Sequence, residues 1–309
     1  GYSRSSVLAV AVDEGRWGEQ DMSQRGERPA SVGGTGRTTV GVGYDHELAG
    51  CGLSCGYGGR PVVNKVNLSL PKGKVSVIIG GNGCGKSTLL KTLARLLDPV
   101  GGSVVLDGRD VHRMPTKELA RTLGLLPQSP LVPEGIHVSD LVARGRYPYR
   151  SLLQPLQDED LRIIAESLDM VGIASLADRP VDELSGGQRQ RVWIAMALAQ
   201  QTDILLLDEP TTYLDVAYQL DILDTLGQIN RERGVTIAMV LHDINMAARY
   251  ADHMYALAGG SIVAEGTPCE VVTPSVLAKV FGLECVVIDD PVSHTPLMVP
   301  TIRVTATVA

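Results

Sequence analysis

A glycine-rich turn between a strand and a helix is the feature that most constrains the fold of this chain. Residues 80–87 read GGNGCGKS and directly follow residues 75–79, an apolar run rich in β-branched residues that is typical of a buried parallel strand. Leucines at helical spacing after the turn predict a helix that Asp98 and Pro99 close. Backbone N–H groups at such a helix start, with a lysine and a serine beside them, supply what phosphates and their metal ion need. We therefore expect a nucleotide-binding fold.

The rest of the chain alternates between strand and helix patterns. Apolar runs predict further strands, and apolar residues at helical spacing between 138 and 178 predict a helical insertion. The other predicted elements are strands at 66–70, 204–208, 236–241, within 255–263 and within 285–304, and a helix at 214–233. This order predicts an α/β fold, with a mostly parallel sheet core, some antiparallel strands and a helical insertion subdomain.

Charge and hydropathy limit the partners. The formal net charge of -7 leaves no broad basic surface for a polyphosphate backbone, so we do not expect nucleic acid as a partner. No apolar run approaches the roughly 20 residues of a membrane-spanning helix. The five cysteines are scattered, which suits a reducing compartment better than a disulfide framework. Residues 1–45 lack a helical or strand period and are expected to be a disordered extension before a domain at 46–309.

Two adjacent carboxylates, Asp208 and Glu209, follow the strand predicted at 204–208. Open parallel sheets present ligand-binding groups at the carboxyl ends of their strands. Asp208 is therefore expected to hold a metal ion, and Glu209 to polarise an attacking water molecule. An acidic pair after a strand is ordinary surface chemistry when it occurs alone, but the glycine-rich turn in the same chain favours the catalytic interpretation.

Residues 184–188, LSGGQ, form a second glycine-containing helix start. Ser185 is the predicted cap of a helix that continues through Trp193 to Gln200. A plain helix cap is one interpretation, and an anion site built from backbone N–H groups is the other. Because this start has no lysine, it suggests half of a phosphate pocket that is completed by another copy of the chain.

The order of these motifs resembles the nucleotide-binding subunit of ATP-binding cassette (ABC) transporters from Leu53 to about Pro300. LSGGQRQR is similar to the family signature, DEPTTYLD joins the acidic pair to a D-loop aspartate, Asp215, and VLHD contains a residue similar to the switch histidine, His242. The resemblance implies a P-loop NTPase of the ABC cassette type. It also implies a head-to-tail homodimer with two ATP molecules, each lying between the phosphate loop of one subunit and the signature of the other.

The resemblance extends to subdomains, with a helical subdomain near 130–185 and a carboxyl-terminal strand segment near 284–305. Individual roles follow from matching positions. Tyr57 resembles the aromatic residue that stacks on adenine, although a packed or solvent-facing tyrosine is the alternative. Gln128, in GLLPQ, resembles the residue that contacts Mg²⁺ or the attacking water, and His242 resembles the residue that contacts the γ-phosphate.

The expected catalytic residues are Glu209, His242, Lys86 and Gln128, and the expected Mg²⁺ ligands are Ser87, Gln128 and Asp208. Lys86 is expected to reach the β- and γ-phosphates. The expected ATP-binding residues are Tyr57, Gly80, Gly81, Asn82, Gly83, Cys84, Gly85, Lys86, Ser87 and Thr88, with Ser185, Gly186, Gly187, Gln188 and Asp215 acting from the second copy.

Three further stretches, GNGCGKSTLL, VARGRYPYRSLL and IDDPVSHTPLMVP, resemble the ATPases of ferric-siderophore importers, especially the ferric enterobactin type. This implies an ATPase that powers uptake of a ferric siderophore through a separate membrane permease, supplied by a siderophore-binding protein. It would lie on the cytoplasmic face of the cell membrane and contact the permease through residues that include 138–149. Haem or cobalamin is the alternative cargo. The alternative from another class is a soluble ABC ATPase without a transport role, although such proteins usually carry two cassettes or a long coiled coil.

Overall fold

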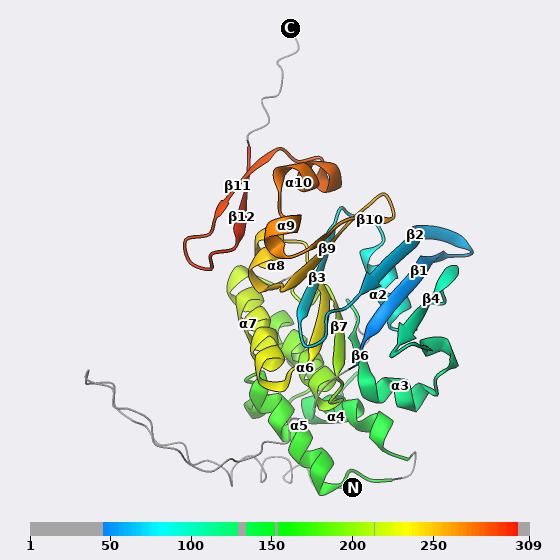
Figure 1. The fold of residues 1–309 in the computed structure, drawn as a ribbon. Coiled ribbons are helices and arrows are strands. Elements are labelled where there is room, and N and C mark those ends of the chain that lie inside the picture. Colours follow the sequence, from blue (N-terminus) through cyan, green and yellow to red (C-terminus); the bar gives the residue numbers. More distant parts are fainter. Residues whose placement is uncertain (1–45, 129–133, 152–153, 213, 302–309) are drawn as a thin grey trace, which may run out of the picture.

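The computed structural model describes residues 46–128, 134–151, 154–212 and 214–301 (Figure 1). The expected disorder of residues 1–45, and the last residues of the predicted 284–305 segment, lie outside these ranges. No helix within them is both long enough and apolar enough to cross a membrane.

The central sheet is mostly parallel. Its strand order is β10-β9-β3-β8-β7-β6, and only the β9–β10 pair is antiparallel. Its strands are β3 (Val75–Gly80), β6 (Leu123–Leu126), β7 (Ile204–Asp208), β8 (Thr236–Val240), β9 (His253–Ala258) and β10 (Ser261–Gly266). The predicted fold class is confirmed, because the chain alternates between these strands and helices that cover the sheet.

A second, antiparallel sheet lies beside the first (Figure 1). Its strands are β1 (Leu48–Tyr57), β2 (Arg60–Ser69), β4 (Gly101–Leu106) and β5 (Arg109–Asp110). Of these strands, the sequence pattern predicted only part of β2 and missed β1, β4 and β5. Register shifts interrupt the pairing of β1 with both neighbours, at Gly50, Cys51 and Cys55 among others, so its side chains do not follow a regular period of two.

Helices lie between the strands in chain order, alone or in succession. They are α2 (Lys86–Leu93), α3 (Thr116–Thr122), α4 (Val138–Ala143), α5 (Asp158–Met170), α6 (Gly186–Ala199), α7 (Val216–Arg233), α8 (Ile244–Tyr250), α9 (Pro268–Val271) and α10 (Pro274–Phe281). Short 3₁₀ helices are η1 (Val111–Arg113), η2 (Arg144–Tyr149), η3 (Ala174–Leu176) and η4 (Val181–Glu183). Helices α4 and α5 lie in the predicted helical region, and they pack against each other and against α6, which follows that region.

The helix predicted after the glycine-rich turn is shorter than expected. It ends at Leu93, because Arg95 adopts a left-handed backbone conformation with φ 57°. The Arg95 guanidinium donates to the carbonyl oxygens of Val111 and Met114, at 2.9 and 2.7 Å, and this holds the turn. Leu96, one of the leucines whose helical spacing predicted a helix up to Asp98, lies beyond the end of α2 and is exposed.

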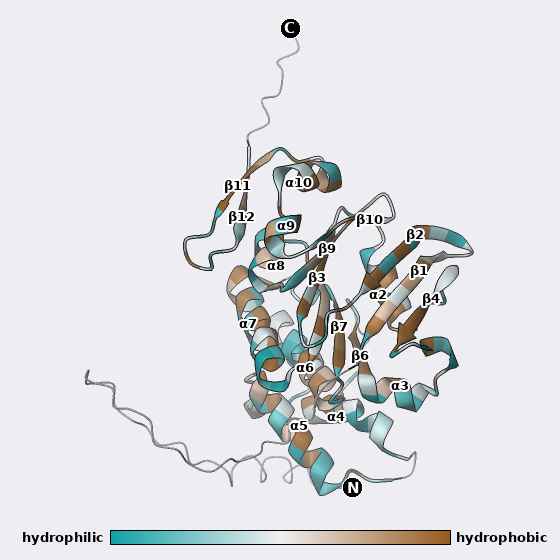
Figure 2. Ribbon diagram, in the orientation of Figure 1, coloured by the Kyte–Doolittle hydropathy of each residue, from teal (hydrophilic) through white to brown (hydrophobic). Residues whose placement is uncertain are grey.

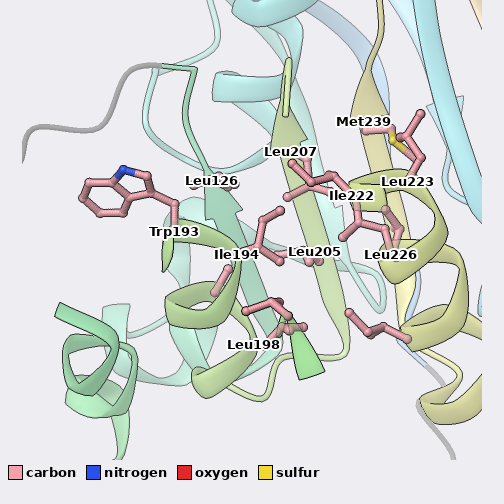
Figure 3. Packing of buried hydrophobic residues seen from close by; sticks show 14 of the residues in the cluster. Leu126, Trp193, Ile194, Leu198, Leu205, Leu207, Ile222, Leu223, Leu226 and Met239 are labelled. Atoms are coloured by element: carbon pink, nitrogen blue, oxygen red, sulfur yellow. The ribbon is translucent and has the colours of Figure 1, made fainter. Parts of the chain in front are cut away.

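Two hydrophobic clusters cover the two faces of the parallel sheet. Side chains alternate along β3, so Val77 and Ile79 join one cluster and Ile78 joins the other. Figure 3 shows the first cluster, in which α6 and α7 place Ile194, Leu198 and Leu226 against β7. Strand β7 (Figure 2) is hydrophobic up to its last residue, Asp208, and is buried throughout, so the packed core fixes the position of its carboxyl end.

The chain closes with a hairpin of β11 (Cys285–Asp289) and β12 (Pro296–Pro300), which pair in antiparallel register. The hairpin packs on α8 and α10, at the opposite end of the molecule from α4 and α5 (Figure 1). Both strands fall within the range in which the sequence predicted them.

Candidate functional site

The glycine-rich turn connects β3 to α2 and requires glycine at two close approaches. A Cβ on Gly80 would lie 2.5 Å from the carbonyl oxygen of Leu257, and one on Gly85 would lie 2.4 Å from Cγ2 of Val63. Gly85 also has φ 104° at the helix start, where a side chain would be strained. The Lys86 ammonium is buried under the turn and donates to the carbonyl oxygens of Gly80 and Gly81, at 2.8 and 3.1 Å.

Ser87 and Asp208 meet at the carboxyl ends of β3 and β7. The Ser87 hydroxyl donates to Oδ1 of Asp208 at 2.7 Å. The side chain of Asp208 is buried, Oδ2 has no hydrogen-bond partner, and the Lys91 ammonium lies 3.9 Å from it. Burial raises the pKa of Asp208 despite the opposing effects of Ser87 and Lys91. A buried, unsatisfied carboxylate oxygen beside a hydroxyl fits the oxygen ligands that Mg²⁺ takes.

Glu209 is surrounded by polar groups from three other positions in the chain. Gln128 Nε2 and Thr212 Oγ1 both donate to Oε2, at 2.5 and 3.0 Å, and His242 Nε2 lies 2.7 Å from Oε1. Burial acts to raise the pKa of Glu209, but hydrogen bonds from His242, Thr212 and Gln128 outweigh it and lower that pKa below its usual value. The carboxylate is therefore held in its ionised form.

The backbone of Glu209 has φ 54°, which is uncommon for a residue with a side chain. Such strain costs on the order of 1–3 kcal/mol and is found mainly at functional sites. A cavity of about 230 Å³ opens beside this residue and is lined by Thr212, Gln219 and His242 among others. It is large enough for water molecules next to the carboxylate.

The signature residues lie at the start of α6. Ser185 caps the helix: its hydroxyl accepts from the N–H of Gln188 at 3.3 Å, and Oε1 of Gln188 accepts from the N–H of Ser185 at 3.1 Å. Asp215 caps α7 by accepting from the N–H of Tyr218 at 3.1 Å. The Tyr218 ring covers Gly187, since an added Cβ there would lie 3.1 Å from Cδ1.

The structure brings together Lys86, Ser87, Gln128, Asp208, Glu209 and His242 at one end of the parallel sheet. Within the described ranges, no hydrogen bond or ion pair joins residues 80–88 to residues 184–188. Each of the two glycine-containing helix starts makes its printed hydrogen bonds apart from the other.

The other predicted residues line or flank the turn. Tyr57 is the last residue of β1, and its side chain is exposed. The Cys84 thiol lies beneath the turn, because a Cβ on Gly80 would be 2.7 Å from Sγ, and it packs against the second hydrophobic cluster. Asn82 and Gly83 are exposed, whereas Thr88 is buried at the helix start.

Thr212 is a site residue that the sequence reasoning did not single out. Its only local signal is a hydroxyl three positions after Glu209, in the turn that follows β7. Ser and Thr hydroxyls often bond to groups this close in turns, so the spacing offered a hint.

A family model described as ABC transporter matches residues 63–212. The chain is 53% identical over 248 residues to the achromobactin transport ATP-binding protein of Dickeya dadantii (strain 3937), covering 80% of this chain and 92% of that protein. It is 51% identical over 253 residues to the ferric enterobactin transport ATP-binding protein of Escherichia coli (strain K12), covering 82% and 93%. A hemin import ATP-binding protein of Rhodococcus jostii (strain RHA1) is 38% identical over 249 residues, covering 81% and 84%.

Solved structures agree in fold. A metal-chelate type ABC transporter in an inward-facing conformation has a TM-score of 0.73 at 27% identity, covering 84% of this chain and 99% of that chain. A bacterial ABC transporter cassette solved as a dimer has a TM-score of 0.64 at 29% identity, covering 71% and 98%. The same kind of cassette in a post-hydrolysis state, bound to ADP and phosphate, has a TM-score of 0.63 at 30% identity, covering 71% and 98%.

Proposed function

This chain belongs to the ABC transporter family, and on that premise we propose that it is the ATP-hydrolysing subunit of an importer for a ferric siderophore. The observation that carries the ATPase activity is the cluster in which Glu209 meets His242 and Gln128, beside the Ser87–Asp208 pair. The names of relatives at 53% and 51% identity, which transport achromobactin and ferric enterobactin, support the cargo class.

Lys86 and the backbone N–H groups of the glycine-rich turn bind the phosphates of ATP. Lys86 exchanges its carbonyl partners, Gly80 and Gly81, for the β- and γ-phosphate oxygens. Ser87, Asp208 and Gln128 would hold Mg²⁺, which would neutralise negative charge on those oxygens when bound. Tyr57, whose ring is exposed, stacks on the adenine.

Glu209 orients and polarises the water that attacks the γ-phosphorus in line, while the bond to the leaving ADP oxygen breaks. Its lowered pKa keeps it ionised at neutral pH. His242, on the same carboxylate, contacts the γ-phosphate and fixes where the water stands. Because positioned charge rather than a covalent intermediate drives this reaction, removal of the Glu209 charge affects turnover more than ATP binding.

A second copy of the chain completes each site. Ser185, Gly186, Gly187 and Gln188 present the start of α6 to the γ-phosphate held by the partner, and Asp215 lies at the same interface. The lack of hydrogen bonds between the two helix starts within one chain is consistent with this arrangement, and the similar cassette that was solved as a dimer supports it.

The importer requires a membrane permease, and a siderophore-binding protein delivers the ferric siderophore to that permease from the opposite side of the membrane. The subunit sits peripherally on the cytoplasmic face of the membrane. We assign the permease contact to residues 138–149 and the adjoining hollow of about 510 Å³, which is lined by Lys117, Tyr147, Arg150 and Ser151. The Tyr147 side chain is exposed there, and the basic lining suits an acidic or helix carboxyl-terminal partner segment.

Hydrolysis and cargo are tested separately. The purified chain is expected to hydrolyse ATP only with Mg²⁺, and loss of the gene is expected to abolish growth on ferric siderophores while growth on haem persists. A growth defect seen only with haem as the iron source would show that haem is the cargo, the alternative that the similarity to a hemin import protein supports. Normal growth on every chelate, with hydrolysis intact, would contradict the transport role.

A further inference from the structure

The side chain of Asn245 joins helix α8 to the carboxyl-terminal hairpin. Its Oδ1 accepts from the N–H of Met298 at 2.8 Å, and its Nδ2 donates to the carbonyl oxygen of Met298 at 3.2 Å. A carboxamide that makes both bonds to one backbone residue imitates a neighbouring strand, so its position and orientation are both fixed.

The register of the hairpin explains why Met298 is free to make these bonds. The N–H of Thr301 donates to the carbonyl oxygen of Glu284, and the N–H of Asp290 donates to that of Thr295. In this register, the backbone N–H and C=O groups of odd-numbered residues from 295 to 301 point toward β11. Even-numbered residues of β12 then direct their backbone groups outward. Pro296 and Pro300 have no N–H, so Met298 carries the single outward N–H donor of β12, and Asn245 accepts it.

The other end of this connection is the catalytic cluster. Asn245 lies in the first turn of α8, which Asp243 caps by accepting from the N–H of Met246 at 2.8 Å. His242 directly precedes the cap, and its Nε2 lies 2.7 Å from Oε1 of Glu209. The hairpin is therefore hydrogen-bonded to the first turn of α8 at Asn245, three positions after His242.

We propose that Asn245 is a positioning residue for ATP hydrolysis, because its carboxamide ties α8 to β12 and so fixes the place of His242 relative to Glu209. This inference rests on the proposed ATPase function and assigns a role in it to the carboxyl-terminal hairpin. The connection is short, because it runs from the backbone of Met298 through the Asn245 carboxamide and the first turn of α8 to the imidazole of His242.

The test compares Asn245→Ala with the unaltered chain in Mg²⁺-dependent hydrolysis. A displacement of His242 by a fraction of an ångström is expected to lower kcat about tenfold, with KM for ATP within about twofold. In a His242→Ala background, Asn245→Ala is expected to lower kcat no further, because both changes then act on the same missing contact. A role confined to folding would reduce activity by the same factor in both backgrounds.

Met298→Pro is a second, independent variant. It removes the N–H that Asn245 accepts but none that pairs with β11, so the hairpin is retained while the connection is cut. It is expected to match Asn245→Ala. Tyr250→Phe is the control on the same helix, since it deletes only the bond from the Tyr250 hydroxyl to Asp224 at the far end of α8 and is expected to leave kcat unchanged.

The outcomes separate the two proposals. Unaltered kcat in Asn245→Ala and Met298→Pro, with an active parent chain, would overturn the positioning role alone. An equal loss in the His242→Ala background would do the same, because it would show a structural rather than positional effect. A parent chain without ATPase activity would overturn the proposed function and this inference together.

Discussion

Removal of the Asp160 carboxylate is predicted to destabilise the helical region severely. Arg146 Nε donates to Oδ1 of Asp160 at 2.8 Å, and the two side chains are only 6% and 8% exposed. The guanidinium also donates to the carbonyl oxygen of Ala199 and to Oε1 of Gln201, at 2.9 and 3.0 Å, and it stacks 4.1 Å from the Tyr149 ring centre. Asp160→Ala would leave this charge buried without its counter-ion.

The expected cost is about 3–5 kcal/mol for breaking a buried pair by removing one partner. Oδ2 of Asp160 also accepts from the N–H of Gln157 at 3.1 Å in the capping box of α5, and loss of a cap adds about 1 kcal/mol. At about 2–4 °C per kcal/mol for a large domain, the melting temperature should fall by roughly 8–24 °C. The double variant Arg146→Met, Asp160→Ala is expected to cost clearly less than the sum of the two single changes, because no charge is then left unpaired.

The assay is urea denaturation followed by tryptophan fluorescence. The chain has two tryptophans, and Trp193 is buried on α6 within the same helical region, so a Trp17→Phe background makes Trp193 the single reporter. Asp160→Ala costing less than about 1 kcal/mol, or strict additivity in the double variant, would refute the idea that this pair is buried and coupled.

Three further predictions concern the nucleotide site. Glu209→Gln should lower turnover by about a hundredfold or more while ATP affinity, measured by calorimetry, changes little; normal hydrolysis by this variant would remove Glu209 from its assigned role. Gly85→Ala should cost roughly 2 kcal/mol and weaken ATP binding, because φ 104° and the contact with Val63 both oppose a side chain, and a wild-type melting temperature would contradict this. Burial acts to raise the pKa of Glu209, whereas hydrogen bonds from His242 and Thr212 lower it below the usual value. The ionised Glu209 therefore stabilises the fold at a pH above its unfolded pKa, and this stabilisation is lost as the pH falls through the lower folded pKa. Thr212→Val should raise the pKa of Glu209 and so move the acidic limb of the pH–activity profile to higher pH, and an unchanged limb would count against that hydrogen bond.

Local patterns predicted the elements that carry the phosphate chemistry. The strand at 204–208, the loop and the acidic pair could be found because each is a short, continuous segment with its own period or composition. The early end of α2 could not, since it depends on Arg95 reaching the carbonyl oxygens of Val111 and Met114, which lie in a later segment of the chain.

The same limit applies to the site. Only the resemblance to a known family predicted that Gln128, Glu209 and His242 act together. Their contacts join residues that are far apart in the sequence, so no local pattern could predict them. Asn245 carries no local sign of its role, because its partner is a backbone group in a hairpin at the end of the chain. Contacts between distant segments are decided by packing, and composition does not reveal them.

The two prolines of β12 have an effect on how the molecule behaves among its neighbours. An unprotected strand border invites foreign strands to add on, which leads to aggregation or exchange of segments between chains. Pro296 and Pro300 have no N–H to donate to an added strand, and the outward N–H of Met298 is already bonded to Asn245. This edge of β12 therefore offers no free backbone N–H donor to an added strand, which disfavours its growth into a larger sheet.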